Sequence, residues 1–197
     1  MGFALSLNIA DITTSYSICS PEQGLEISKK FTHPLYRDGP HFNARAALFH
    51  LMLQYQISLK QHPLKENIIS NHLELKNDPD WKVSLSHTKN YGLAMLARGV
   101  RSVGIDCEFF DRKINEKALR HYAHPKDDDL SLITYSYLGL WCIKEASFKA
   151  LSPLTKEPLY LKDIWVKKEG SFGIESKQYG QYDLKVDGPL LIARAFI

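Results

Sequence analysis

The stretch Trp-Cys-Ile-Lys-Glu-Ala-Ser-Phe-Lys at residues 141–149 decides the fold of the second half of the chain, because it predicts a helix. Neither Gly nor Pro interrupts it, and good helix formers dominate. Residues three, four and seven positions apart share one face of a helix, so Glu145 and Lys149 are expected side by side between Trp141 and Phe148. Taken alone, the stretch favours an ordinary exposed Glu–Lys pair worth about 0.2–0.5 kcal/mol.

A second stretch, Val-Gly-Ile-Asp-Cys-Glu-Phe-Phe at residues 103–110, predicts a strand because its apolar residues alternate. Asp106 and Glu108 then share one face, with their backbone positions roughly 7 Å apart. Two bare carboxylates at this spacing repel each other, and a hard cation such as Mg²⁺ between them would remove that cost. A solvated acidic strand face is the alternative, and an Asp-x-Glu pattern alone discriminates weakly.

Together the two stretches carry a family resemblance. Val-Gly-Ile-Asp-x-Glu at 103–108, followed by Trp-x-x-Lys-Glu-Ala-x-x-Lys at 141–149, resembles the signature pair of the 4′-phosphopantetheinyl transferase superfamily. Ser-Leu-Ser-His at 84–87 resembles the Ser-His motif of the two-lobed branch, the surfactin-synthetase-activator type. The resemblance covers about residues 81–151. It implies an α+β fold of two similar lobes, residues 1–102 and 103–197, in a pseudo-twofold arrangement with the active site in the cleft between them.

The resemblance also implies a reaction. Coenzyme A is the co-substrate, and its phosphopantetheine arm passes to a serine of an apo acyl or peptidyl carrier protein. Asp106, Glu108 and Glu145 hold Mg²⁺. Glu145 takes the proton of the serine, directly or through a metal-bound water, and Lys149 neutralises charge that grows on the transferred phosphate.

The same resemblance assigns the phosphates of the coenzyme to five side chains, Arg45, Ser86, His87, Lys144 and Lys149. An ordinary surface arginine is an equal alternative for Arg45, and for Lys144 a role in solvent is nearly as plausible as a phosphate contact. Where the family carries Ser-x-x-Glu, this chain has Lys126 and Asp127, so Asp127 is the candidate for a fourth acidic residue. Asp127 and its two acidic neighbours are more simply explained as capping the next helix.

Composition narrows the class of protein. Of 197 residues, 44% are hydrophobic and 24% charged, which is typical of a globular protein with a sizeable core. The net charge of +3 is too mild to indicate a nucleic-acid partner, but it suits an anionic coenzyme and an acidic carrier protein. Three isolated cysteines argue against a zinc site or disulfides, and no run is long enough to span a membrane. We expect a cytoplasmic monomer without a secretory signal.

Periodicity predicts the remaining elements. Helices are expected at 42–57, where Asn43 could cap the first turn, at 115–124 and at 130–151. Strands are expected at 3–12, 68–75, 81–87, 91–98, 163–168, 171–175, 182–186 and 190–197.

Two other functions fit the same residues. One is a different Mg²⁺-dependent enzyme, such as a phosphohydrolase, which would use the three carboxylates to release inorganic phosphate. The other is a module that binds carrier proteins without catalysis. The presence of all four residues, Asp106, Glu108, Glu145 and Lys149, speaks against the second.

Overall fold

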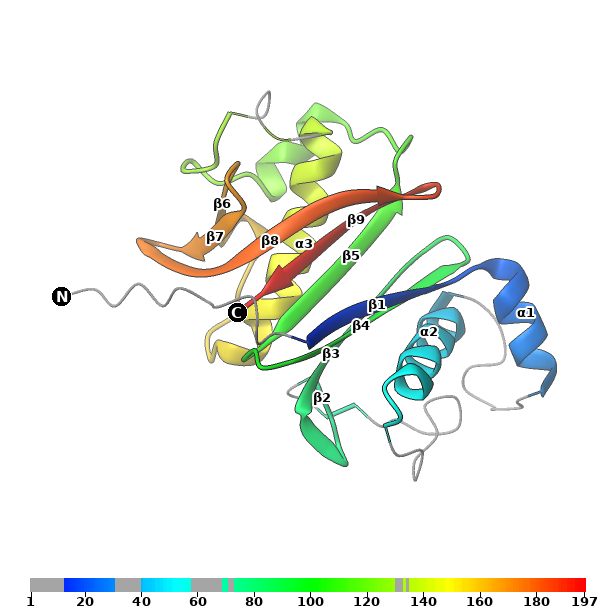
Figure 1. Ribbon diagram of the computed structural model, residues 1–197. Coiled ribbons are helices and arrows are strands. Elements are labelled where there is room, and N and C mark those ends of the chain that lie inside the picture. Colours follow the sequence, from blue (N-terminus) through cyan, green and yellow to red (C-terminus); the bar gives the residue numbers. More distant parts are fainter. Residues whose placement is uncertain (1–12, 31–39, 58–68, 71–72, 130–132, 134) are drawn as a thin grey trace.

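The computed structural model describes residues 13–30, 40–57, 69–70, 73–129, 133 and 135–197 (Figure 1). The fold is mixed α and β, with two antiparallel sheets. The first sheet has the order β1-β4-β3-β2 and the second the order β5-β9-β8-β7-β6. The chain passes from the first sheet to the second between β4 and β5.

The first sheet contains β1 (Thr13–Cys19), β2 (Glu74–Leu75), β3 (Asp78–Thr88) and β4 (Tyr91–Arg98). Two helices precede β2, namely α1 (Pro21–Lys30) and α2 (Pro40–Gln54). The second sheet contains β5 (Val103–Phe109), β6 (Ile164–Lys167), β7 (Ser171–Ile174), β8 (Lys177–Asp187) and β9 (Leu190–Phe196). Between β5 and β6 lie α3 (Ser136–Leu151) and the short 3₁₀ helices η2 (Glu116–His121), η4 (Ser152–Leu154) and η5 (Leu161–Asp163).

The elements pack in layers, each joined to the next by a buried apolar cluster. Helix α2 covers the first sheet through residues such as Leu48, and α3 covers the second sheet through residues such as Ile143. The opposite faces of the two sheets meet in a third cluster, to which Met95 of β4 and Ile105 of β5 belong. Figure 1 shows α2 and α3 on opposite sides of the sheets. Strand β5 therefore lies between the first sheet and α3.

Several predicted elements are confirmed. The helix predicted at 42–57 is α2, and the predicted hairpin of 81–87 and 91–98 is formed by β3 and β4. The alternation predicted for β5 is also confirmed, because Val103, Ile105 and Cys107 lie in the cluster between the sheets. The four strands predicted after residue 163 are β6 to β9. The strand predicted at 3–12 lies outside the described residues.

Other predictions were wrong. The helix predicted at 115–124 is shorter, a 3₁₀ helix η2 over Glu116–His121, and α3 starts at Ser136 rather than near residue 130. Tyr135, directly before α3, has a left-handed backbone with φ 63°, which a helix cannot continue through. Asn43 does not cap α2; its side chain is buried and donates to the carbonyl of Asn90.

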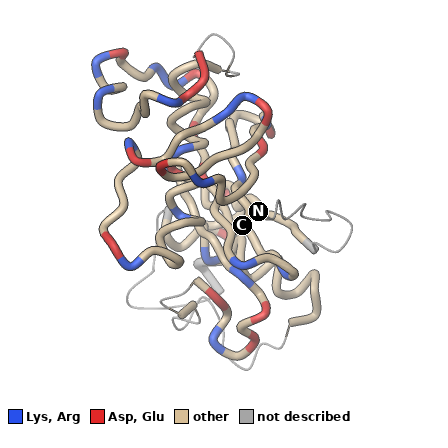
Figure 2. The backbone as a smooth tube through the Cα atoms, turned by 90° about the vertical axis from the view of Figure 1, so that its left-hand side faces the viewer, with Lys and Arg blue, Asp and Glu red and all other residues tan. Residues whose placement is uncertain are grey.

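Charges of both signs are spread over the described chain. Lys and Arg are interspersed with Asp and Glu along the tube in Figure 2. Within the described ranges, no helix combines the length and the apolar character needed to cross a bilayer.

Candidate active site

The candidate site forms where α3 crosses β5, and Gly104 allows that approach. A Cβ atom at Gly104 would lie 1.9 Å from the carbonyl oxygen of Ala146 in α3, so any larger residue would push strand and helix apart. Side chains alternate along a strand, so Asp106 and Glu108 point to the same side as Gly104, toward α3. The helix brings Glu145 and Lys149 to this side. The two motifs that lie far apart in the sequence therefore meet in space.

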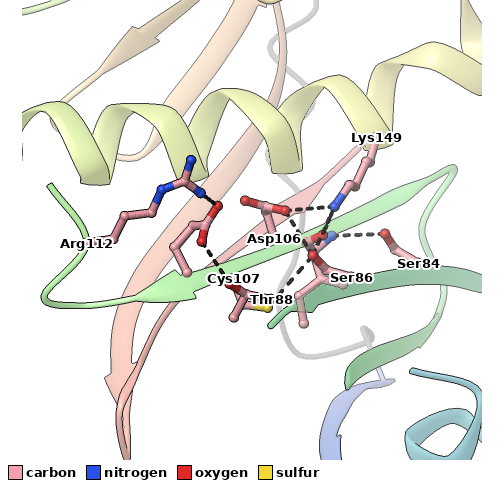
Figure 3. A network of polar contacts seen from close by, with 9 residues as sticks. Ser84, Ser86, Thr88, Asp106, Cys107, Arg112 and Lys149 are labelled. Carbon is pink, nitrogen blue, oxygen red and sulfur yellow. Dashed lines mark hydrogen bonds and ion pairs between the residues drawn. The ribbon is translucent and has the colours of Figure 1, made fainter. Parts of the chain in front are cut away.

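Lys149 makes the most direct connection between them. Its Nζ lies 2.8 Å from Oδ1 of Asp106, 3.0 Å from the carbonyl oxygen of Ile105 and 3.1 Å from Oγ of Ser86 (Figure 3). The Asp106 side chain is only 10% exposed and that of Lys149 25%, so water screens this ion pair weakly. The exposed Glu–Lys pair that the helix alone favoured is not what the structure shows, because Lys149 pairs with an aspartate of β5.

Glu145 belongs to the same electrostatic cluster. Burial raises the pKa of its carboxyl group, and the negative charges of Asp106 and Glu108 raise it further, while Lys149 opposes them. Burial also raises the pKa of Glu108, against a hydrogen bond from Thr88 and the charge of Arg112. Raised carboxyl pKa values caused by burial and like charges are characteristic of functional sites.

These carboxylates suit Mg²⁺ in kind. Carboxylate oxygens are hard ligands, and a cation among them would relieve the repulsion that, in addition to the larger effect of burial, raises the pKa of Glu108 and Glu145. Within the described part of the chain, however, no three acidic, His or Cys side chains already surround one ion position. Asp106 is paired with Lys149, and Glu108 is paired with Arg112. The donor set fits the metal in kind, and beside Glu108 a Mg²⁺ ion would take the place of the exposed Arg112.

The two residues of the Ser-His pair predicted to bind coenzyme, Ser86 and His87, lie in different environments. Ser86 is 5% exposed, and its Oγ donates to Oδ1 of Asp106 at 2.9 Å, so its hydroxyl supports the carboxylate cluster. His87 is exposed, and its ring packs edge-on against His41 with 4.3 Å between the centroids. Partial burial of the ring, and then the charges of His41 and Lys149, lower the pKa of His87. His87 is therefore close enough to Lys149 to sense its charge.

His41 is a member of this region that the sequence analysis missed. It lies in the first turn of α2, four residues before Arg45, and the two therefore share one face of the helix. Arg45 is itself partly buried. The spacing His-x-x-x-Arg at the start of the predicted helix was the available signal, because it places two nitrogen donors one turn apart.

Lys144 lies away from the cluster. Its side chain is fully buried, and its Nζ bonds to Asp127 at 2.8 Å and to the carbonyl of Ile164. These contacts tie Lys144 to Asp127 and to β6, and none of them involves Asp106 or Lys149. Burial lowers the pKa of this lysine to about 8, against the charge of Asp127.

Asp127 accordingly takes neither predicted role. Its carboxylate accepts from the backbone N–H of His124 at 2.7 Å and of Val166 at 2.8 Å, in addition to Lys144. It joins the loop before α3 to β6 instead of capping a helix or extending the acidic cluster. Asp128 similarly pairs with Lys167 of β6.

Comparison with known families supports the resemblance in the sequence. Residues 102–185 match the family model of the 4′-phosphopantetheinyl transferase superfamily. The match covers less than half of the chain, and it includes all of β5 and α3, the two elements that supply the acidic cluster and Lys149. It supports a transferase activity at the level of this superfamily. A comparison with curated proteins found no match to the chain.

Proposed function

We propose that this protein is a 4′-phosphopantetheinyl transferase that moves the phosphopantetheine arm of coenzyme A to a serine of a carrier protein. One observation carries the proposal. Asp106 and Glu108 of β5 share an electrostatic cluster with Glu145 and Lys149 of α3, within the segment that matches the superfamily.

Asp106, Glu108 and Glu145 would hold Mg²⁺. A magnesium ion there would supply positive charge that binds the diphosphate of coenzyme A and stabilises charge during its cleavage.

Glu145 is the proposed proton acceptor. The serine oxygen of the carrier forms a bond to the phosphorus that bears the pantetheine arm, and the bond from this phosphorus to the bridging diphosphate oxygen breaks. The products are the modified carrier and 3′,5′-ADP. A serine hydroxyl is a weak nucleophile, and a carboxylate whose pKa is raised by burial accepts its proton more readily.

Lys149 is the proposed source of charge stabilisation. Asp106, Ser86 and the carbonyl of Ile105 fix its ammonium group, so it needs little reorganisation when negative charge grows on the phosphate oxygens. Its three contacts come from β3 and β5, whereas Lys149 itself belongs to α3.

The coenzyme would lie between two lobes, residues 1–102 and 103–197, in a pseudo-twofold arrangement. Arg45 and His87 of the first lobe would hold its phosphates, together with Lys149 of the second. A single chain then supplies both sides of the site, which supports a monomer. Three buried free cysteines support a reducing compartment such as the cytoplasm.

One experiment tests the function directly. The protein is incubated with coenzyme A, Mg²⁺ and apo carrier proteins of the fatty-acid, polyketide and nonribosomal-peptide types, and the carriers are weighed by mass spectrometry. We expect one carrier to gain the mass of a phosphopantetheine group, and Asp106→Ala to abolish the gain while leaving the circular dichroism spectrum unchanged.

Two results would count against this function. Release of inorganic phosphate with no labelled carrier would favour a phosphohydrolase that uses the same carboxylates. Binding of a carrier with neither product would favour a module without catalysis.

A further inference from the structure

Three hydroxyl groups of β3 reach the open edge of β5. Ser84, Ser86 and Thr88 alternate along β3 and therefore point to the same face of the strand. Ser84 Oγ accepts from the backbone N–H of Ile105 at 3.0 Å. Ser86 Oγ donates to Asp106 Oδ1, and Thr88 Oγ1 donates to Glu108 Oε2, both at 2.9 Å (Figure 3).

This row of contacts replaces backbone pairing between the two sheets. Among the described strands, β5 pairs only with β9, and residues 84–88 of β3 pair only with β4. The edges of β3 and β5 meet, and hydrogen bonds of the β3 hydroxyls, rather than hydrogen bonds between backbone groups, join them. Hydroxyl groups of the N-terminal half of the chain thereby donate hydrogen bonds to two carboxylates of the C-terminal half, Asp106 and Glu108.

Thr88 binds one carboxylate and has a stiff side chain. It is 9% exposed, so its hydrogen bond to Glu108 is little weakened by water. A β-branched residue has few χ1 rotamers, which holds the hydroxyl in place. Ser86, in contrast, also contacts Lys149 and Cys107, so that replacing it would disturb three groups at once.

Glu108 needs such support because its own side chain is long. Arg112 binds the other oxygen of its carboxylate, but the Arg112 side chain is 48% exposed, and exposed pairs contribute little. The contact with Thr88 is partly buried, and it is therefore the stronger restraint on the Glu108 carboxylate.

We propose that Thr88 is a positioning residue that orients Glu108 for metal binding. This inference rests on the proposed function, because it concerns the same carboxylates. Carboxylates that bind metals are themselves held by hydrogen bonds, and loss of one such partner typically weakens metal affinity about 10–100-fold. Thr88 lies outside residues 102–185, so the family match assigns it no role.

The test measures metal binding without turnover. Mn²⁺ is titrated into the protein, with and without coenzyme A, and free Mn²⁺ is followed by electron paramagnetic resonance. We expect Thr88→Val, which keeps the shape but lacks the hydroxyl, to raise the Kd for Mn²⁺ about 10–100-fold. Thr88→Ala should do the same, whereas Thr88→Ser, which keeps the hydroxyl, should bind nearly as the unsubstituted protein.

Thr14→Val is the matched control. The Thr14 hydroxyl is buried and has no hydrogen-bond partner within the described part of the chain, so the same chemical change there should leave the Kd unaltered. Thermal unfolding of every variant separates loss of metal affinity from loss of fold.

Each outcome bears on the inference. Unchanged Kd values in Thr88→Val and Thr88→Ala, with Asp106→Ala losing the site, would overturn the role of Thr88 and leave the metal site standing. Equal Mn²⁺ uptake by Asp106→Ala and the unsubstituted protein would overturn both, since no metal would then sit at these carboxylates.

Discussion

Lys149 is the residue at which the two motifs and the two sheets converge. Its ammonium group contacts oxygens of Ser86, Ile105 and Asp106, which belong to β3 and β5. A lysine held by three acceptors is a preorganised cation, and preorganised charge stabilises a transition state more than a mobile charge does. The sequence predicted its nearness to Glu145 but not its contact with Asp106.

Replacing Lys149 should therefore reduce turnover more than coenzyme binding. We expect Lys149→Ala to lower kcat about 100-fold with a smaller change in the KM for coenzyme A. Steady-state kinetics with a carrier protein measure both constants, and Lys156→Ala, at an exposed lysine, is the control. A raised KM with unchanged kcat would show that Lys149 binds the ground state only.

At the scale of elements, the approach of α3 to β5 depends on Gly104. No other residue fits between the strand and the carbonyl of Ala146 without movement of backbone. The distance between the motif of β5 and the motif of α3 is therefore set by a residue with no side chain.

Gly104→Ala should weaken both the fold and the site. Overpacking of this kind costs about 1–3 kcal/mol of unfolding free energy, which urea denaturation measures. Because the helix must shift, activity at a temperature where the variant is folded should fall as well. A variant with normal stability and normal kcat would contradict the close approach. Gly188→Ala is the control for adding a methyl group, since nothing lies within 4 Å of a Cβ there, although its φ of 56° adds backbone strain.

The buried pair of Lys144 and Asp127 gives α3 a second fixed contact. It ties the middle of the helix to the loop before it and, through Val166 and Ile164, to β6. Removing one member of a buried ion pair leaves an uncompensated charge in the interior, which is far more costly than losing an exposed pair.

Lys144→Met should accordingly destabilise the protein by about 3–5 kcal/mol and leave the KM for coenzyme A unchanged at temperatures where the variant is folded. Chemical denaturation measures the loss of stability, and initial rates measure the KM for coenzyme A. The double variant Lys144→Met, Asp127→Leu should recover part of the stability, because no charge remains buried. A large rise in KM with little loss of stability would instead indicate that Lys144 binds the coenzyme.

The sequence predicted the elements better than the contacts between them. Alternation along β5 and helical spacing along α3 are local patterns, so the sequence predicted both. It therefore also predicted that Asp106 and Glu108 share one face of the strand and that Glu145 and Lys149 share one face of the helix. The start of α3 was not predicted correctly, because a left-handed Tyr135 has no clear sequence signal. The partner of Lys144 was not predicted either, since Asp127 lies 17 residues away in a loop whose path depends on β6.

At the scale of the whole molecule, the two sheets are joined by the apolar cluster between them and by a polar contact near one end. Tyr16 of β1 donates to Asp187, at the end of β8, with an O–O distance of 2.5 Å. Lys185 and Arg194 of the second sheet lie over its ring, at 4.2 and 5.5 Å from the centroid. This contact and the hydroxyls of β3 hold the two halves in register, which matters because both contribute to the candidate site.

Tyr16→Phe should loosen this connection and change how stability depends on pH. Burial, and then the hydrogen bond and charge of Asp187, raise the pKa of Tyr16 above its ordinary value. Below about pH 10 the tyrosine is protonated in both folded and unfolded chains, so its hydrogen bond should contribute about 1.5 kcal/mol, a low value for a bond to a charged group because the pair is partly exposed. Above that pH the tyrosine ionises in the unfolded chain while it keeps its proton in the folded chain, so this stability is lost as pH rises.

Urea denaturation at pH 9 and pH 11 should therefore show that the stability advantage of the unsubstituted protein over Tyr16→Phe becomes smaller at the higher pH. The exposed Tyr135→Phe is the control, and an advantage that stays constant between the two pH values would refute the proposed link between the sheets.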